Sequence, residues 1–270
     1  ITAFLQTRFT QPSVRNNQIG QGSMSGYFTY TEIVDFVDSL HTAYPNIMSA
    51  PVTIGQTAEG HNIQAYKISD NPNSNENEPE VLITGLHHAR EPMSIVAPLY
   101  YTQWLLENYN TNELATYLVN EREIWIVPIL NIDGYLYNQQ IAPQGGGMWR
   151  KNKRDNNNNG VFNSNFDGVD INRNYGFEWG YDDEGSSPEP SAETYRGPSA
   201  FSELESQAIR DFCIDNNFRT ALNFHTFGDL FIYSGHANGD NFPDIELFRE
   251  YGDDSTKDNG YTYGNDVETV

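Results

Sequence analysis

One corner of the chain constrains its fold more than any other stretch. The apolar run at residues 81–84 predicts a buried strand, and the apolar pattern over residues 93–106 predicts a helix directly after it. The residues from Gly85 to Pro92 contain two histidines, an arginine and a glutamate. Because α/β folds place their functional groups where strands end, we expect this corner to carry the chemistry of the protein.

His88 and Glu91 have the spacing of a metal-ligand pair. Zinc binds imidazole nitrogen and carboxylate oxygen, and a catalytic zinc needs only three protein ligands and a water. The His-x-x-Glu pattern is weak by itself, but His225 ends a further apolar run and offers a third ligand, with a satisfied core histidine as the alternative. Together the three residues predict a zinc site. His87 would point away from His88 in an extended backbone, so we do not predict it as a ligand.

Length and composition limit the kinds of partner. At 270 residues the chain is long enough for one large α/β domain, and no Pro/Gly/Ser-rich linker divides it. The formal net charge of -22, from 15 basic and 37 acidic residues, argues against nucleic acid and anionic membranes as partners. No apolar run approaches the roughly 18 residues of a membrane span. The single cysteine, Cys213, excludes an intrachain disulfide, and its helical context predicts a small core residue.

Regular elements are predicted on both sides of the corner. Thr29 and Glu32 have the capping-box spacing before a helix that ends near Pro45, and Ser202 and Glu205 have the same spacing before a second helix. Helices interleaved with buried strands predict an α/β sandwich, in which helices flank a mixed, mostly parallel central sheet. The predicted strands cover residues 52–55, 63–69, 81–84, 124–130, 220–225 and 230–233.

Two stretches lack a regular pattern. Residues 1–24 are polar, and we interpret them as an extended N-terminal arm or a precursor tail before a domain of residues 25–270. The start at Ile1 rather than methionine suggests that something upstream was removed. Residues 138–195 break into glycines, asparagines and aromatic residues. Because ordering so long a segment is entropically costly, we expect it to be functional.

Several blocks of sequence occur in the order found in one enzyme family. The chain resembles the zinc carboxypeptidases of the carboxypeptidase A type, most closely the bacterial carboxypeptidase T group. The resemblance extends over residues 26–264, and its specific blocks are residues 85–91, 131–134, 148–151, 170–175, 195–197 and 224–227. It implies hydrolysis of the C-terminal peptide bond of peptides with a free C-terminal carboxylate.

The resemblance also implies roles for individual residues. It places the zinc ligands on His88, Glu91 and His225. Asn172 and Arg173 match the family's carboxylate clamp, since a guanidinium can bind a carboxylate through two parallel hydrogen bonds.

Two further arginines match residues that contact the substrate. Arg150 matches the arginine that polarises the scissile carbonyl and stabilises the developing oxyanion. Arg90 matches the residue that contacts the substrate further along the cleft. For Lys151, Lys153 and Arg154 we favour the alternative of solvated surface charges.

Two polar loops suggest calcium. Asp70, Glu76, Glu78 and Glu80 crowd one loop, where like charges repel unless water or a hard cation screens them. The carboxypeptidase T resemblance implies calcium there, and a solvated turn is the alternative. The segment at residues 155–160 mimics the first half of an EF-hand loop, but Phe166 takes the place of the twelfth-position glutamate. A plain turn is therefore favoured.

The family pattern continues beyond this sequence. The block at residues 261–264 matches one that precedes a substrate-capping tyrosine and the glutamate that activates the zinc water, whereas this sequence stops at Val270. We expect the last strand and the glutamate on an associated C-terminal fragment or on a missing portion of the protein. The pocket that sets side-chain specificity is expected there too.

Two other functions stay open at this point. One is a zinc amidase or deacylase that acts on acyl-amino acids or peptidoglycan peptides with the same ligands. The other is a non-catalytic module that binds C-terminal peptides and lacks the glutamate base. The resemblance and the processed-looking start also imply a secreted or periplasmic protein.

Overall fold

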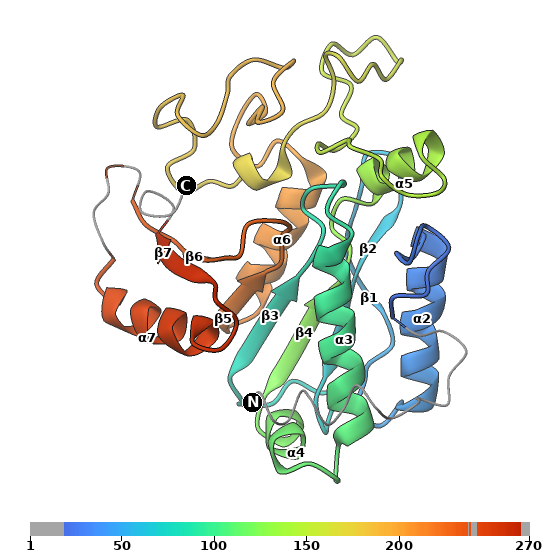
Figure 1. The fold of residues 1–270 in the computed structure, drawn as a ribbon, viewed down its shortest axis with the longest axis vertical. Helices are drawn as coiled ribbons and strands as arrows, with labels where there is room; N and C mark the ends of the chain where they lie inside the picture. The colour runs from blue at the N-terminus through green and yellow to red at the C-terminus, as the bar shows by residue number, and fades with distance from the viewer. Residues whose placement is uncertain (1–18, 237, 239–241, 266–270) are drawn as a thin grey trace. The chain divides into compact units, whose positions relative to one another are not determined.

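A five-stranded mixed sheet organises most of the computed structural model (Figure 1). β3 pairs parallel with both β4 and β5, while β2 pairs antiparallel with β1 and with β4. The predicted mixed α/β sheet is thereby confirmed, although its pairings are half parallel rather than mostly parallel. In spatial order the strands are β1 (Val52–Gln56), β2 (Asn62–Ile68), β4 (Glu123–Val127), β3 (Glu80–Thr84) and β5 (Phe218–Asn223).

The structure describes residues 19–236, 238 and 242–265. They fall into two compact units, and the sheet belongs to the unit of residues 19–226. In the other unit, residues 227–265, β6 (Leu230–Tyr233) pairs parallel with β7 (Thr262–Asn265), and α7 (Ile245–Thr256) connects them. The single domain predicted for residues 25–270 spans both units and stays a prediction.

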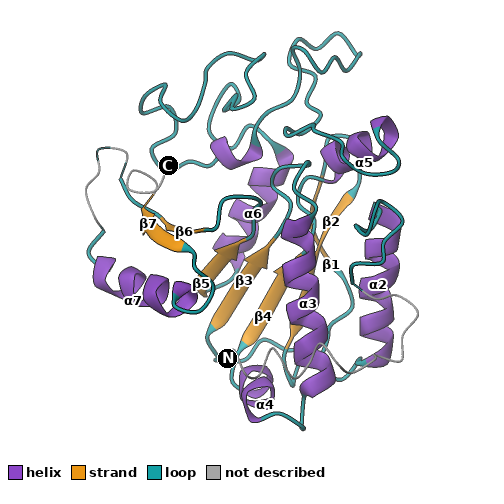
Figure 2. Ribbon diagram, in the orientation of Figure 1, coloured by secondary structure: helices purple, strands orange, loops and turns teal. Residues whose placement is uncertain are grey.

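Helices cover both faces of the central sheet. α3 (Met93–Asn108) lies over one face, and α6 (Leu204–Asp215) lies over the opposite face (Figure 2). α2 (Tyr30–Ala43) begins at the predicted capping box, in which the Glu32 amide donates to the Thr29 hydroxyl and the Thr29 amide donates to the Glu32 carboxylate. The remaining helices of this unit are α4 (Glu113–Asn120), α5 (Ile132–Ile141) and the short 3-10 helix η1 (Ile171–Arg173). In the part of the chain that is described, no helix combines the length and apolarity needed to cross a bilayer.

Three local predictions were wrong, each for a physical reason. The Ser202 hydroxyl donates to Glu203 at 2.6 Å, and α6 begins without a side-chain cap at Glu203, so this capping box does not form. β4 ends at Val127 because Pro128 has no N–H with which to continue the ladder. Cys213 is exposed on α6 rather than buried in the core.

Strand β5 is less buried than its apolar sequence predicts. Half-buried and exposed residues alternate along it. The reason is its position, because β5 pairs only with β3 and forms an edge of the sheet among the described residues. β3, which lies between β4 and β5, is buried along most of its length.

The N-terminal segment contacts the core where it is described. Residues 1–18 of the predicted arm lie outside the described residues. Met24 is buried, and Ile19 packs against the same hydrophobic core. The Tyr27 amide donates to the Met24 carbonyl in a short turn just before α2.

Buried polar side chains order the long segment between α5 and α6. Asn138 binds both backbone groups of Trp149, at 2.8 and 2.9 Å, and Asp155 accepts the amide of Gly160 in the plain turn that was favoured over calcium. Lys151 is almost completely buried and donates to the Pro190 carbonyl at 2.7 Å, so the prediction of a solvated lysine was wrong. Side-chain bonds to the backbone thus give the segment a defined conformation without helices or strands over most of its length.

Glu205 on α6 is a buried acid with incomplete hydrogen bonding. One carboxylate oxygen accepts from Asn152 Nδ2 at 3.2 Å, and the other has no hydrogen-bond partner within the described ranges. Burial, together with the nearby charge of Glu203, raises the pKa of Glu205 to about 8. The ionised form of Glu205 is therefore unfavourable in the folded protein.

The Glu205→Gln substitution is expected to remove a pH dependence of stability. An unfolded chain releases the glutamate proton near pH 4.3, whereas the folded protein keeps the Glu205 proton up to about pH 8. The wild-type free energy of unfolding should therefore fall with rising pH in this window, by at most about 1.4 kcal/mol per pH unit. Urea unfolding across this range measures the effect, with Glu107→Gln, an exposed site on α3, as the control. Parallel pH profiles for wild type and Glu205→Gln would contradict the prediction.

Candidate metal centre

The corner after β3 is a tight turn that only particular residues can form. A Cβ atom at Gly85 would lie 2.7 Å from the Ser94 carbonyl oxygen and 2.9 Å from that of Pro128, so only glycine fits. Leu86 has a φ of 55°, in the left-handed region. Its amide donates to the Ser94 hydroxyl, which donates in turn to the Glu91 carbonyl at 2.6 Å. These bonds fix the segment that carries His88 and Glu91.

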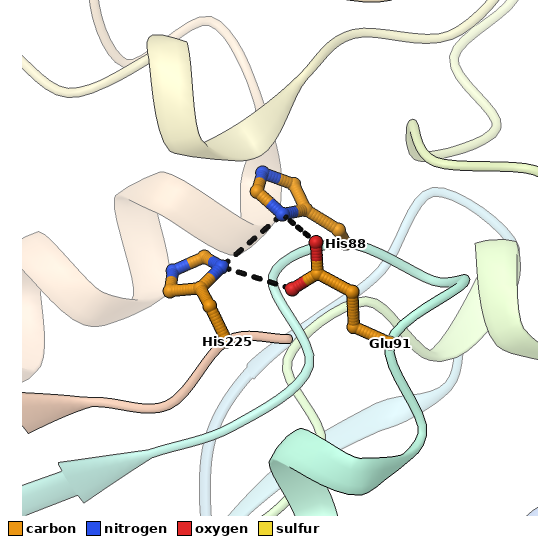
Figure 3. A group of neighbouring side chains, drawn as sticks. All are labelled: His88, Glu91 and His225. Carbon is orange, nitrogen blue, oxygen red and sulfur yellow. Dashed lines mark hydrogen bonds and ion pairs between the residues drawn. The ribbon is translucent and has the colours of Figure 1, made fainter. Parts of the chain in front are cut away.

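Three predicted ligands face one another beyond the strand ends (Figure 3). His88 Nδ1 lies 2.7 Å from Glu91 Oε1, and His225 Nδ1 lies 3.1 Å from Glu91 Oε2. The two imidazole Nδ1 atoms are 3.1 Å apart. Because β5 runs parallel to β3, the carboxyl ends of the two strands lie side by side, and His225 follows β5 at the same end of the sheet at which His88 follows β3.

This donor set fits a zinc ion. Two imidazole nitrogens at such a short distance repel through their lone pairs unless a proton or a cation lies between them. Two nitrogens and one carboxylate are the ligands of one group of catalytic zinc sites. One donor atom from each of His88, Glu91 and His225 lies within 4.8 Å of the other two, so a single cation can contact all three side chains.

The charge states of the donors respond to one another. Burial opposes ionisation of Glu91, but hydrogen bonds from His225 and His88 outweigh it and hold the pKa of Glu91 well below its usual range. Burial would also lower the pKa of His88, but close contacts with Asp170 and Glu91 outweigh it and raise that pKa. The three side chains therefore form an anionic carboxylate beside two proton- or metal-binding nitrogens.

Asp170 is a site residue that sequence reasoning missed. Its carboxylate is completely buried, with Oδ1 3.3 Å from His88 Nε2 and Oδ2 accepting from Arg150 at 2.7 and 3.0 Å. Burial disfavours its charge, yet the contact with His88 and the charges of Arg150 and Arg173 lower the pKa of Asp170 to about 2. In the sequence, Asp170 opens the family-specific block of residues 170–175 and has the character of a helix cap before Ile171, but neither signal indicated its contacts with His88 and Arg150.

The predicted arginines lie in different surroundings. Arg150 NH1 is 4.0 Å from Glu91 Oε1, which places its guanidinium beside the metal donors. Arg173 Nε donates to the Gly185 carbonyl at 2.6 Å. The backbone N–H of the neighbouring Asn172 donates to the Asp170 carboxylate. Arg90 forms an ion pair with Glu193 at 3.0 Å.

Arg154 was predicted to be a solvated charge, but it pairs with the buried Glu203 at 2.9 Å. Lys153 pairs with Glu59 near the surface. Both ion pairs join residues that are far apart in sequence, which a local pattern does not reveal.

Three of the four residues predicted for calcium come together. Carboxylate oxygens of Asp70, Glu76 and Glu78 lie within 4.8 Å of one another. Glu80 does not join them, because it begins β3 as a buried residue and accepts the Asn217 amide at 2.6 Å. The prediction of Glu80 as a calcium ligand was therefore wrong.

The mixed α/β sheet and the facing His-Glu-His donors are typical of zinc hydrolases with an open coordination position. Residues 33–269 match the zinc carboxypeptidase family, and the chain belongs to this family. The resemblance found in the sequence is confirmed at this level, and the closer likeness to carboxypeptidase T stays a prediction.

Similar proteins include both enzymes and an inactive relative. The chain is 37% identical over 172 residues to a zinc carboxypeptidase of Saccharothrix mutabilis subsp. capreolus, covering 64% of this chain and 37% of that protein. It is 31% identical over 187 residues to an inactive metallocarboxypeptidase of Uncinocarpus reesii, covering 68% of this chain and 30% of that protein.

A solved structure shares the fold. Carboxypeptidase A from Helicoverpa armigera superimposes with a TM-score of 0.75 at 29% identity, covering 95% of this chain and 62% of that one. The chain thus spans less than two thirds of the length of each of these proteins.

Asp170→Asn is expected to weaken zinc binding. The substitution keeps the side-chain shape but removes the charge that contacts His88 and Arg150, and loss of such an outer partner typically costs about 10–100-fold in metal affinity. Competition with a chelating zinc indicator measures the effect, and Asp35→Asn, on the exposed face of α2, is the control. Equal zinc affinity of wild type and Asp170→Asn would contradict the role given to Asp170.

Proposed function

We propose that this chain contributes the metal centre and the carboxylate-binding residues of a zinc-dependent metallocarboxypeptidase that hydrolyses the C-terminal peptide bond of peptides. One observation carries the proposal: the facing donors of His88, Glu91 and His225 lie beside the Arg150 guanidinium. When bound there, zinc would polarise a carbonyl and supply an activated water.

Arg150 stabilises negative charge that develops on the substrate carbonyl oxygen. Its Nε and NH2 atoms are held by Asp170, so NH1, near Glu91, is the nitrogen left to donate toward the metal donors. A donor aimed at a developing oxyanion contributes on the order of 3 kcal/mol to catalysis. The bond to Asp170 fixes the guanidinium before substrate arrives.

Arg173 binds the free carboxylate at the C-terminus of the peptide. Two of its nitrogens donate to the carbonyl oxygens of Gly185 and Asn172, and it forms no ion pair with any residue in the described ranges. Its positive charge is therefore not cancelled by a direct contact, which suits a guanidinium that has to recognise an anion. Arg90 contacts the substrate further along the cleft.

A non-catalytic peptide-binding module is the second candidate. It is favoured by the inactive metallocarboxypeptidase of Uncinocarpus reesii, to which this chain is 31% identical. A zinc amidase or deacylase would use the same three ligands on a different substrate. Secretion or export of the protein stays a prediction from the family resemblance.

The full-length protein is expected to release the C-terminal amino acid from a blocked dipeptide. A chelator should abolish the release and zinc should restore it, because the donors of His88, Glu91 and His225 must hold the ion. Arg173→Gln should raise KM by about 10–100-fold, the effect of losing a charge-assisted hydrogen bond. Arg122→Gln, at an arginine on the surface before β4, is the matched control and should leave KM unchanged.

The same assay separates the alternatives. Faster turnover of acyl-amino acids or cell-wall peptides than of the dipeptide would favour the amidase. Binding of C-terminal peptides by the full-length protein without any turnover would favour the non-catalytic module. Activity that persists in metal-free protein would contradict all three zinc-dependent functions.

We further propose that Asp70, Glu76 and Glu78 bind a calcium ion. Glu78 Oε2 is buried and has no hydrogen-bond partner in the part of the chain that the structure describes. Burial and the charges of Glu76 and Asp70 raise the pKa of Glu78, which indicates that its negative charge lacks compensation from the protein. Calcium prefers carboxylate oxygen and would supply that compensation.

Calcium is expected to raise the melting temperature. Binding to the folded state alone stabilises it by about 2.7 kcal/mol at a calcium concentration 100 times the Kd, which corresponds to a shift of several degrees. Thermal unfolding with and without calcium measures the shift in wild type, in Glu78→Gln and in the control Glu113→Gln. The shift should disappear only in Glu78→Gln, and an equal shift in all three proteins would contradict the site.

A further inference from the structure

His87, next to the metal ligand His88, is buried and has a specific partner. It is 1% exposed, and its Nε2 atom lies 2.7 Å from the hydroxyl oxygen of Tyr175. Its Nδ1 atom has no hydrogen-bond partner among the described residues. A buried imidazole with a single polar contact depends on that contact for its orientation, because no other hydrogen bond to the ring fixes it.

The ring of His87 packs against a metal ligand. Its centroid lies 5.6 Å from the centroid of His225, with an angle of 36° between the ring planes. The His225 side chain is 31% exposed and follows the edge strand β5, so it has fewer neighbours than His88, whose side chain is 5% exposed. Within the described residues, His87 therefore packs against the more exposed of the two histidine donors.

Tyr175 belongs to the segment that carries the proposed carboxylate clamp. It lies two residues after Arg173, and the intervening Asn174 anchors the segment by donating to the carbonyls of Arg196 and Ser199 at 2.9 and 3.0 Å. The Tyr175 ring also packs edge-on against Phe201, with ring centroids 6.0 Å apart. The tyrosine hydroxyl is thus presented to His87 from a well-anchored position.

We infer that His87 and Tyr175 form a positioning pair for the candidate metal centre. Their hydrogen bond holds the His87 ring against His225, which keeps His225 Nδ1 directed at Glu91. The same bond fixes the spacing between the metal donors and the clamp at Arg173. Neither residue binds the metal or the substrate. The inference rests on the proposed zinc function, whose failure the experiment below distinguishes.

A plain structural role is the competing explanation. A buried tyrosine hydroxyl that donates one hydrogen bond stabilises a fold wherever it occurs, and its loss lowers stability without any effect on a distant site. Tyr135 provides the comparison, because it is 2% exposed and its hydroxyl donates to the Phe28 carbonyl at 2.5 Å. Tyr135→Phe therefore removes an equivalent hydrogen bond from another part of the core.

Zinc affinity tests the positioning pair. Tyr175→Phe and His87→Phe should each weaken zinc binding by about tenfold, the lower end of the range seen when an outer partner of a ligand is lost. Both substitutions remove the same hydrogen bond, so their effects should not add. The double variant should bind zinc about as tightly as whichever single variant has the lower zinc affinity. Tyr135→Phe should bind zinc like wild type even if its melting temperature falls. His87→Gln, which can keep a hydrogen bond to Tyr175, should recover part of the affinity.

The outcomes separate the two proposals. The titration uses zinc alone in competition with a chelating indicator, after circular dichroism of each metal-free variant has established its folding. If wild type fails to bind zinc, both the proposed function and the positioning pair are wrong. If wild type binds zinc and Tyr175→Phe and His87→Phe bind it equally well, only the positioning pair is wrong. In the active full-length protein, Tyr175→Phe should also raise KM for a peptide, since Arg173 loses its fixed distance from the metal donors.

Discussion

The buried carboxylate of Asp170 is the interaction on which the candidate site depends. Removing a carboxylate from water is costly unless cationic groups and hydrogen bonds compensate the charge. Asp170 receives two guanidinium hydrogen bonds from Arg150 and one from the Asn172 amide, and it contacts His88 Nε2. A single side chain thereby contacts a candidate metal ligand, the arginine beside it and the start of the proposed clamp segment. These elements can be correctly placed only together.

The sheet explains how residues so far apart in sequence reach Asp170. Parallel pairing of β3 with β5 brings the ends of the two strands to one edge, where the chain turns into His88 on one side and continues to His225 on the other. The Ala89 amide donates to the Arg150 carbonyl at 3.0 Å, which ties the long irregular segment to the corner. The strand ends thus supply the three candidate ligands and an attachment point, while the irregular segment supplies Arg150, Asp170 and Arg173.

The sequence predictions were accurate where a feature depends on residues close together in the sequence, and they failed where it depends on residues far apart. The buried strand before Gly85, the capping box at Thr29 and the three metal donors were predicted because each depends on a local pattern or on a strand end. The contact of Asp170 with His88 and that of Tyr175 with His87 were not predicted, since the paired residues are 82 and 88 positions apart in the sequence. Glu80 was wrongly predicted as a calcium ligand for a related reason. Its carboxylate accepts the backbone N–H of Asn217, just before the neighbouring strand β5, and this contact is not visible in the local sequence.

The contacts of the arginines give a further reason to assign substrate recognition to Arg173. Arg150 is paired with Asp170, Arg90 with Glu193 and Arg196 with Asp183, so a carboxylate of the protein already lies against each of these guanidinium groups. Arg173 donates to backbone carbonyls, which orient the guanidinium but leave its charge in place. In a protein with a net charge of -22, an approaching carboxylate is repelled over most of the surface. A positive charge that is oriented but not neutralised would therefore provide local attraction for the C-terminus of a peptide.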